Sequence, residues 1–246
     1  MFFRKAHRFL YFGLVLFFFL LAYPALWYFA KNPKTNYQQI ASIRKWFSVW
    51  SARMAGIRFQ IDYESPIDWS KPYVICPNHT STLDITALTY LCPVPFSFIG
   101  KHELLDNFVT RLFFKSIDIP VDRKSKISSY KAFKRGNELL KEGKSVVVFP
   151  EGKIDDEYPP RLHPFKAGPF KMAIENQIEI LPVIIHNAWK ILWDDGIKYG
   201  SRPGTIYISV LNPIDTKKIS DGYNSIEDEL YSKMNTCWLE KPESKR

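Results

Sequence analysis

The feature that most limits how this chain can fold is the uncharged run from Phe9 to Ala30. Nearly every side chain in it is apolar or aromatic. As a helix rising 1.5 Å per residue, the run spans roughly 33 Å, enough to cross the apolar core of a bilayer. We therefore predict a long N-terminal helix that attaches the protein to a membrane.

The same run differs from a cleavable secretory signal. A signal has a shorter apolar region and small residues at its cleavage site, whereas bulky Trp27-Tyr28-Phe29 stands near the end of this run. Basic residues flank the run on both sides, so the positive-inside rule gives no orientation. Pro24 leaves two geometries open, a full membrane span and a kinked helix that is half inserted.

Composition supports a membrane-associated protein in a reducing compartment. Aromatic residues make up 16% of the chain and the net charge is +9, which suits an anionic membrane surface. Nucleic acid would also suit this charge, but no helix-turn-helix, zinc-finger or RNA-recognition motif is present. The three cysteines show neither metal-ligand spacing nor an obvious disulfide framework. We expect a membrane partner, no nucleic acid, and a main domain on the cytoplasmic face.

An amphipathic helix is predicted over residues 37–55. Five apolar side chains recur at helical spacing and share one face: Ile40, Ile43, Phe47, Trp50 and Met54. We expect Arg44 to lie off this face and Gly56 to end the helix. The apolar face suits either a lipid surface or the protein core, and both interpretations stay open.

From Ile57 onward, short apolar runs alternate with helical patterns. The first run, residues 57–63, alternates apolar and polar side chains as a half-exposed edge strand does. Further strands are predicted over residues 73–76, 96–99, 117–121, 146–149, 180–185 and 205–211. Helices are predicted over residues 82–91, 103–115, 128–142, 165–177 and 225–239. This order predicts an α/β fold with a mostly parallel central sheet flanked by helices, spanning residues 57–246 after an anchor segment of residues 1–56.

Reactive side chains gather where the predicted strands end. His79 follows the second strand, and Asp84 comes five residues later in the first turn of a helix. Asp84 can then hold one imidazole nitrogen, fix the tautomer and leave the other nitrogen as a base. We also expect the helix N-terminus to lower the pKa of Asp84. Lys101, Arg123 and Glu151 stand at other strand ends, and the carboxyl ends of parallel strands meet at one edge. The sequence therefore predicts a site for an anionic substrate there.

Several motifs follow one another in a fixed order: NHTSTLD at 78–84, GKHEL at 100–104, PVDR at 120–123, FPEG at 149–152 and HPFKAG at 163–168. Together they resemble the glycerolipid acyltransferase family, the group of lysophosphatidic acid (1-acyl-glycerol-3-phosphate) acyltransferases. The resemblance covers roughly residues 70–190. A hydrophobic N-terminal anchor is also usual in that family.

The resemblance implies an O-acyltransferase in which His79 is the general base and Asp84 orients it. A lipid hydroxyl is a poor nucleophile and a thioester an activated electrophile, so removal of the hydroxyl proton by a neutral histidine accelerates attack about 10²–10⁴-fold. The donor would be acyl-CoA or an acyl-[acyl-carrier protein], with no bound cofactor, metal or covalent enzyme intermediate. The acceptor would be a lysophospholipid, most simply 1-acyl-glycerol-3-phosphate.

By the same resemblance, four residues would position the acceptor: Lys101, Arg123, Glu151 and Gly152. The family usually continues FPEG with Thr, Arg and Ser, whereas this chain continues with Lys153, Ile154 and Asp155. Ile154 stands at the arginine position and cannot bind a phosphate; Lys153 or Arg161 could compensate. Another lysolipid, for example one that contains an amino acid, is therefore the alternative acceptor.

Three other function classes fit parts of the sequence. A metal hydrolase would need ligands whose separations match no compact metal-binding motif: His79, Asp84, His102 and His163. Cys76 as an acyl-accepting nucleophile would lie within an apolar strand, where a thiol is usually inert. A non-enzymatic membrane scaffold would need neither the His–Asp pair nor the polar strand ends.

Overall fold

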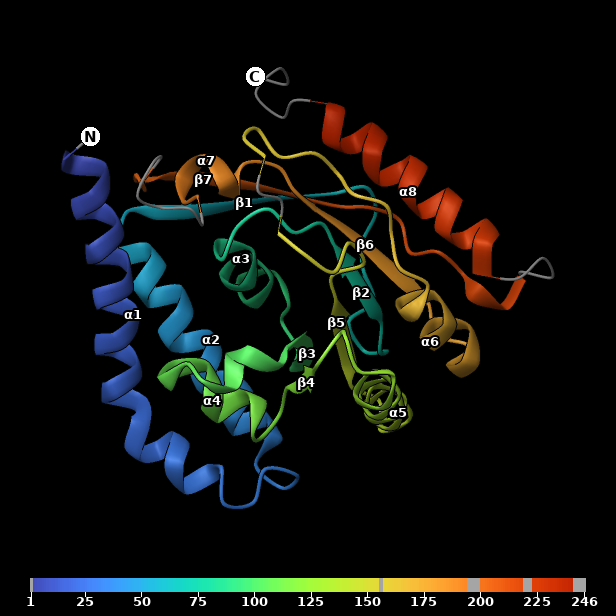
Figure 1. Ribbon diagram of the computed structural model, residues 1–246, viewed down its shortest axis with the longest axis horizontal. Helices are drawn as coiled ribbons and strands as arrows, with labels where there is room; N and C mark the ends of the chain where they lie inside the picture. Colours follow the sequence, from blue (N-terminus) through green and yellow to red (C-terminus); the bar gives the residue numbers. More distant parts are fainter. Residues whose placement is uncertain (1, 155–156, 194–199, 219–222, 241–246) are drawn as a thin grey trace.

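One central sheet organises this protein, shown as a computed structural model in Figure 1. The structure describes residues 2–154, 157–193, 200–218 and 223–240. Within these residues the strand order is β1 (Ile57–Tyr63), β7 (Gly204–Val210), β6 (Ile180–Ile185), β2 (Val74–Pro77), β5 (Ser145–Val148), β3 (Phe96–Lys101) and β4 (Ile119–Val121). Strands β6 through β4 run parallel, β7 is antiparallel to β6, and β1 is parallel to β7. The predicted α/β fold with a mostly parallel sheet is confirmed.

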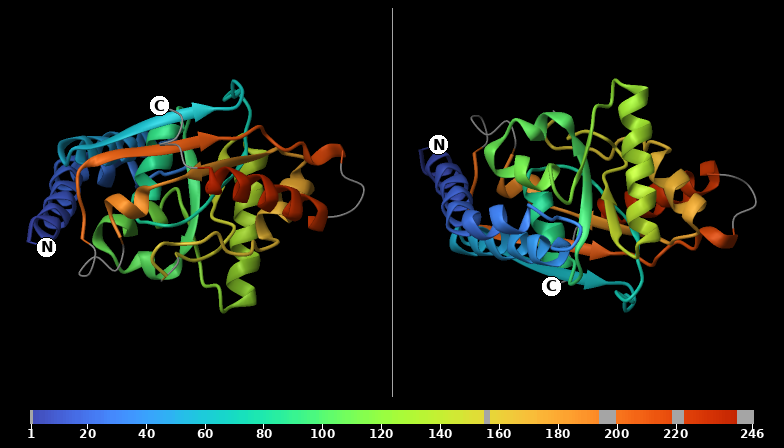
Figure 2. Two further views of the ribbon diagram at one scale, coloured as in Figure 1. Left: turned by 90° about the horizontal axis from the view of Figure 1, so that it is seen from above. Right: turned by 90° about the horizontal axis from the view of Figure 1, so that it is seen from below.

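Helices cover both faces of the sheet (Figures 1 and 2). On one side lie α1 (Phe2–Phe29), α2 (Tyr37–Met54), α3 (Leu83–Leu91), η1 (His102–Leu105), α4 (Phe108–Phe114) and α7 (Ala188–Ile191). On the other lie α5 (Lys126–Lys141), α6 (Gly168–Asn176), η2 (Thr216–Lys218) and α8 (Tyr223–Leu239). Because side chains alternate along a strand, neighbours such as Val74 and Ile75 of β2 enter different cores.

The burial of the strands follows their places in the sheet. β2 and β6 lie near its centre and are buried along their whole length, as apolar strands covered on both faces should be. β1 lies at one edge and alternates buried or half-buried with exposed side chains over most of its length. The edge strand predicted over residues 57–63 therefore occurs at those residues.

The helix predicted over residues 103–115 is divided into η1 and α4. The Asn107 side chain accepts hydrogen bonds from the backbone N–H groups of Val109 (2.9 Å) and Thr110 (3.2 Å). A side chain in this position starts a new helix, because it satisfies N–H groups that have no partner inside the helix. The prediction of one continuous helix was wrong for this reason.

The helix α1 contains the uncharged run and packs along α2 and α4 (Figure 1). On its inner face the buried Phe19 ring contacts the rings of Phe47 and Phe113. Its outer face keeps large apolar side chains exposed: Phe9, Phe17, Leu20, Leu21 and Trp27. Among the described residues, α1 is the one helix long and apolar enough to cross a membrane. It therefore has one face for the protein and one that the protein leaves uncovered.

The amphipathic helix predicted over residues 37–55 is α2, but its buried face differs from the predicted one. Phe47 is buried, whereas Trp50 is exposed. Arg44, expected off the buried face, is buried and pairs with Asp118 at 2.8 Å. That expectation was wrong because Asp118, which is distant in sequence, offsets the cost of removing the Arg44 guanidinium from water. The periodicity of a helix cannot reveal such a partner.

Gly56 lies beyond the end of α2, with a φ of +72° that favours glycine. The segments on its two sides nevertheless share a core. Tyr11 of α1 and Ala52 of α2 belong to the same apolar cluster as Ile75 of β2. The division into residues 1–56 and 57–246 stays a prediction, and helices of residues 1–56 pack in one core with the strands of the sheet.

Candidate active site

The histidine of NHTSTLD lies on the turn between β2 and α3, at the carboxyl edge of the parallel strands. His79 Nδ1 lies 3.0 Å from Asp84 Oδ2. The same carboxylate oxygen accepts hydrogen bonds from the backbone N–H groups of Thr80 (2.6 Å) and Ser81 (2.8 Å). Asp84 is in the first turn of α3, so its carboxylate reaches back over the turn. Donation from Nδ1 to the carboxylate leaves Nε2 as the basic nitrogen.

Burial sets the electrostatics of this pair. Asp84 is fully buried, and burial raises the pKa of its carboxyl group above the ordinary value of 3.8. Hydrogen bonds from His79, Ser81 and Thr80 lower this pKa and oppose the shift. Our expectation of a lowered pKa was wrong, because the loss of water outweighs the donors at the start of α3. The carboxylate's Oδ1 has no hydrogen-bond partner among the residues that the structure describes.

An aromatic ring fixes the plane of the imidazole. Phe149, at the end of β5, stacks on His79 with the ring centroids 3.8 Å apart and the planes 21° apart. The His79 side chain is 14% exposed, so the ring is mostly shielded but still reachable. Phe149 begins the FPEG motif, and its place directly after an apolar strand was the available signal for this contact.

Glu151 is buried and joins two segments through their backbones. Its Oε1 accepts a hydrogen bond from the His79 N–H and its Oε2 one from the His163 N–H, both at 2.8 Å. Asn78 links β2 to β6 in a similar way: its Oδ1 accepts from the Ile185 N–H at 2.7 Å and its Nδ2 donates to the Ile185 C=O at 3.2 Å. From the sequence we expected Glu151 to act only toward the acceptor, and we expected no separate role for Asn78. The structure places both where they hold the histidine turn.

Gly152 brings the FPEG turn close to two basic side chains. Its φ is +70°, and a Cβ there would lie 2.9 Å from Lys166 Nζ. The Gly152 carbonyl accepts a hydrogen bond from Arg123 Nη1. The positive φ therefore favours glycine at this position, and the absence of a Cβ lets the lysine approach without moving. Arg123, at the start of the loop after β4, is thereby tied to the end of β5.

A cavity of about 650 Å³ opens beside His79. Of the residues predicted at strand ends, Lys101 and Arg123 line this cavity, whereas Glu151 and the neighbouring Gly152 are not among its lining residues. Phe149, Lys153 and Ile154 line it as well. Much of the remaining wall is apolar and comes from several helices: Phe12, Val15, Leu16, Phe47, Val109 and Phe113. The helix α1 thus forms part of the cavity.

A buried ion pair also lines this cavity. Arg44 Nη1 donates to Asp118 Oδ1 at 2.8 Å, and Arg44 Nη2 donates to the Phe96 carbonyl at 2.6 Å. Phe96 begins β3, whereas Lys101 ends it, so the pair lies toward the strand's other end from the histidine. The cavity therefore extends from a polar opening with His79 past apolar side chains to a buried charge pair.

Two candidates for the acceptor side are separated by the structure. Lys153 lines the cavity. Arg161 is exposed, pairs with Glu157, and is not among the lining residues. Asp155, which follows Ile154, lies outside the described residues. Of the two basic residues considered as replacements for the family arginine, only Lys153 is at the cavity.

The side chains considered for a metal hydrolase and for a cysteine nucleophile are not arranged for those reactions. In the described parts of the chain, no three His, Cys, Asp or Glu side chains come together, so His79, Asp84, His102 and His163 do not assemble a metal-ligand set. Cys76 is buried in β2, and burial raises the pKa of its thiol. A thiol in such surroundings stays protonated and is a poor nucleophile.

This chain is similar to known proteins in sequence and in structure. The model of the family described as Acyltransferase matches residues 57–186. A 1-acyl-sn-glycerol-3-phosphate acyltransferase of Borreliella burgdorferi is 28% identical over 200 residues, which cover 77% of this chain and 75% of that protein. The 1-acyl-sn-glycerol-3-phosphate acyltransferase beta of Homo sapiens is 28% identical over 206 residues, which cover 80% and 71%.

The solved structures include one with the same fold. It is the crystal structure of the 1-acyl-sn-glycerophosphate (LPA) acyltransferase of Thermotoga maritima. The two chains are 16% identical and superimpose with a TM-score of 0.71. The superposition covers 94% of this chain and 96% of that one. At this identity the match establishes a shared fold.

Proposed function

This chain belongs to the acyltransferase family and is an acyltransferase, and from that premise we propose that it moves a fatty acyl group from an acyl thioester to the free hydroxyl of 1-acyl-glycerol-3-phosphate. The product is phosphatidic acid. The observation that carries the proposal is the 3.0 Å contact between His79 Nδ1 and Asp84 Oδ2 beside a largely apolar cavity. A lysolipid with another head group is the alternative acceptor.

In the proposed reaction, His79 Nε2 removes the proton of the acceptor hydroxyl as its oxygen attacks the thioester carbonyl carbon. Collapse of the tetrahedral intermediate breaks the carbon–sulfur bond, and the departing thiolate takes the proton from Nε2. Asp84 holds the tautomer and stabilises the imidazolium formed between these steps. Glu151 keeps the His79 backbone in place, so we assign it to positioning.

The cavity supplies a place for the fatty acyl chain. Its helix-derived walls are mostly apolar, and burial of each CH₂ group of the chain contributes about 0.8 kcal/mol. Lys101, Arg123 and Lys153 line the same cavity as His79, where they suit an anionic head group. With Ile154 in the wall, the phosphate has no arginine from that position. Lys153 is the cation that replaces it in our proposal.

A panel of acceptors tests the function. Purified full-length protein would be given palmitoyl-CoA and, separately, palmitoyl-[acyl-carrier protein], with lysophosphatidic acid, lysophosphatidylglycerol or an amino-acid-containing lysolipid. We expect the highest kcat/KM for lysophosphatidic acid. A clear preference for a lysolipid without a terminal phosphate would establish the alternative acceptor, and absence of any acyl transfer would remove the proposal.

We propose that α1 attaches the protein to the membrane by lying in its surface, with the catalytic domain on the cytoplasmic side. A spanning helix would need its whole circumference for lipid, but Phe19 and Leu26 are fully buried against the protein. The outer apolar face fits the boundary between head groups and acyl chains. Three free cysteines, two of them buried, agree with a reducing compartment.

Flotation with lipid vesicles tests this attachment. Removal of α1 is unsuitable because Val15 and Leu16 line the cavity, so we choose the double variant Phe17→Glu with Leu20→Glu on the exposed face. Each lost apolar contact is worth up to about 1.5–3 kcal/mol, so binding should fall on the order of 10²-fold. The matched control, Ile127→Glu with Tyr130→Glu on α5, should float like the unmodified protein. Equal flotation of the α1 variant would place the attachment elsewhere.

A further inference from the structure

The start of α5 and the loop before it are strongly basic, and apart from Arg123 these basic residues have no role in the active site. From residue 123 to residue 137 the chain has no Asp or Glu, and six positions are Lys or Arg: Arg123, Lys124, Lys126, Lys131, Lys134 and Arg135. The lysines of this stretch are exposed, and among the described residues none of them has an acidic partner. The N-terminal end of the helix adds a partial positive charge. The exposed lysines therefore carry positive charge that no carboxylate of the described residues pairs with, whereas Arg135 pairs with Glu138.

Two large apolar side chains stand within this basic surface. Ile127 is 70% exposed and Tyr130 is 67% exposed. Together with Lys131 and Lys134 they follow the i, i+3, i+4 and i+7 spacing of one helix face. The opposite face of α5 packs in the core, where Ala132, Leu139 and Leu140 are buried in one apolar cluster. The exposed face is therefore not needed to pack the helix.

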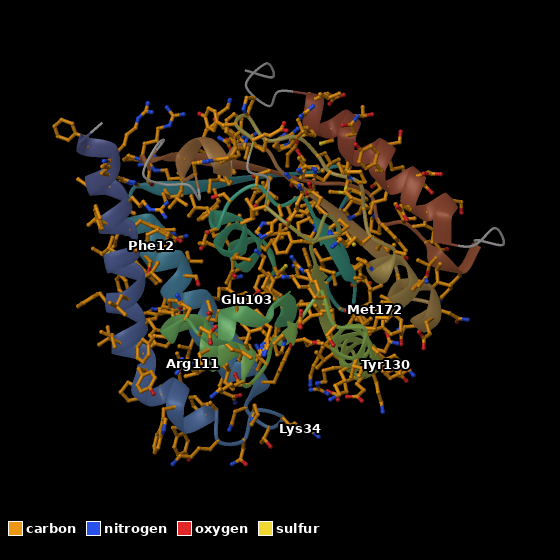
Figure 3. The ribbon with its side chains drawn as sticks, in the orientation of Figure 1. Phe12, Lys34, Glu103, Arg111, Tyr130 and Met172 are labelled. Carbon is orange, nitrogen blue, oxygen red and sulfur yellow. The ribbon has the colours of Figure 1, made fainter. Side chains whose placement is uncertain are left out.

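This face lies beside the opening of the cavity. The helix α5 begins directly after β4 and the loop that carries Arg123, which lines the cavity and bonds the Gly152 carbonyl. Figure 3 labels Phe12 on α1, Arg111 on α4 and Tyr130 on α5, which lie in that order across the molecule. Figures 1 and 2 likewise place α4 between α1 and α5. The basic face is thus on the far side of the cavity from the apolar outer face of α1.

We propose that this face, made of Ile127, Tyr130, Lys131 and Lys134, docks an acidic carrier protein that delivers the acyl chain as a thioester. The inference rests on the proposed function, because that function requires a thioester donor at the cavity. Complementary charge draws an acidic partner to the lysines and speeds its encounter. The exposed isoleucine and tyrosine supply an apolar contact at the centre of the patch.

A membrane is the competing partner for a basic surface with apolar side chains. The outer face of α1 presents many large apolar side chains, whereas α5 presents two, across the molecule. A bilayer contacted by α1 takes the side of the cavity formed by that helix, and the side of α5 is left for a soluble donor. The arrangement therefore places the membrane and the carrier on opposite sides of one opening.

Charge reversal with two donors tests the docking surface. Full-length protein with Lys131→Glu and Lys134→Glu would be assayed with palmitoyl-[acyl-carrier protein] and with palmitoyl-CoA. We expect KM for the carrier-bound donor to rise about tenfold while kcat/KM for palmitoyl-CoA stays within about twofold. Arg58→Glu with Lys217→Glu is the control, because it removes the same charge from exposed positions outside α5. A second variant, Ile127→Ser with Tyr130→Ser, should weaken carrier use without a change of charge.

Binding measured without turnover separates this inference from the proposed function. Titration of the protein with unacylated holo-acyl-carrier protein should show binding that weakens at high salt and in both α5 variants but not in the control. Such binding with no acyl transfer by the unmodified protein would support the docking surface and reject the proposed reaction. Equal losses with both donors, or unchanged carrier kinetics, would overturn the inference. Loss of flotation on phosphatidylglycerol vesicles with unchanged carrier use would overturn it in favour of the membrane.

Discussion

The histidine side of the cavity and its acceptor side are held in different ways. On the histidine side, neighbours in sequence hold one buried carboxylate: Asp84 receives the His79 imidazole and two backbone N–H groups. On the acceptor side, Lys101 and Lys153 are exposed and come from the ends of different strands. Backbone donors cannot change with sequence, whereas exposed side chains can. The reaction is therefore built into a local turn, whereas the choice of acceptor depends on replaceable side chains.

One residue connects the two sides. Glu151 accepts hydrogen bonds from the backbone of His79 and from that of His163, and Gly152 beside it receives Arg123. A change at Glu151 should therefore disturb both regions, whereas changes on either side should keep their effects apart.

Replacement of His79 by alanine should reduce kcat/KM about 10²–10⁴-fold, because no base remains to remove the hydroxyl proton. The unfolding midpoint should stay near that of the unmodified protein, since Asp84 keeps its two backbone donors. The control is His102→Ala, an exposed histidine in η1 that should keep activity. Near-normal turnover by the His79 variant for all acceptors would show that this histidine is not the general base.

Replacement of Asp84 by asparagine should lower kcat about 10²–10³-fold, because an amide no longer fixes the tautomer or stabilises the imidazolium. The loss should be equal for every acceptor if the histidine side carries only the reaction. Steady-state rates with the lysolipid panel measure this. A loss that differs strongly between acceptors would show that the two sides are not separate.

The same variant tests the burial of the carboxylate through pH. Burial raises the pKa of Asp84 above 3.8, so ionisation costs the folded state more than the unfolded state. The protonated Asp84 carboxyl group therefore contributes to the stability of the folded protein at low pH. This contribution is lost as pH rises through the pKa of Asp84 in the folded state. The asparagine does not titrate, so its unfolding temperature relative to the unmodified protein should rise with pH above 3.8 and then level off. Thermal unfolding of both proteins across this pH range measures the effect. A difference in unfolding temperature that stays constant or falls with pH would mean that burial does not dominate the pKa of Asp84.

Replacement of Glu151 by glutamine should lower activity roughly tenfold and stability by about 1–3 kcal/mol, because the new NH₂ group faces a backbone donor. Both reaction rate and acceptor preference should change. Glu157→Gln, at an exposed ion pair with Arg161, is the control and should change little. Activity loss with unchanged preference would assign Glu151 to the histidine side alone.

Replacement of Ile154 by arginine should have the smallest effect and act on one side only. A guanidinium at the cavity wall should raise kcat/KM for lysophosphatidic acid about three- to tenfold relative to a lysolipid without a terminal phosphate. Ile154→Gln, polar but uncharged, should leave the preference for lysophosphatidic acid as it is in the unmodified protein. An unchanged ratio in the arginine variant would mean that this position does not face the acceptor's phosphate.

The structure also shows which contacts sequence reasoning can and cannot find. The edge strand at residues 57–63 and the alternation of strands and helices follow from side-chain periodicity, which repeats within a few residues. The division of residues 103–115 depends on one cap, Asn107, whose preference is local but competes with the helical pattern around it. The reversed direction of β7 in the sheet has no local signal at all.

The α/β fold class, the apolar N-terminal helix and the family could be predicted from the sequence, because they follow from periodicity and from short motifs of fixed spacing. The contact between His79 and Asp84, residues five positions apart, could also be predicted. Only the tertiary structure decided that α1 forms a wall of the cavity and that Arg44 pairs with Asp118, 74 positions away. Such contacts form when distant segments pack together, and the energy of packing depends on neighbours that no local pattern contains.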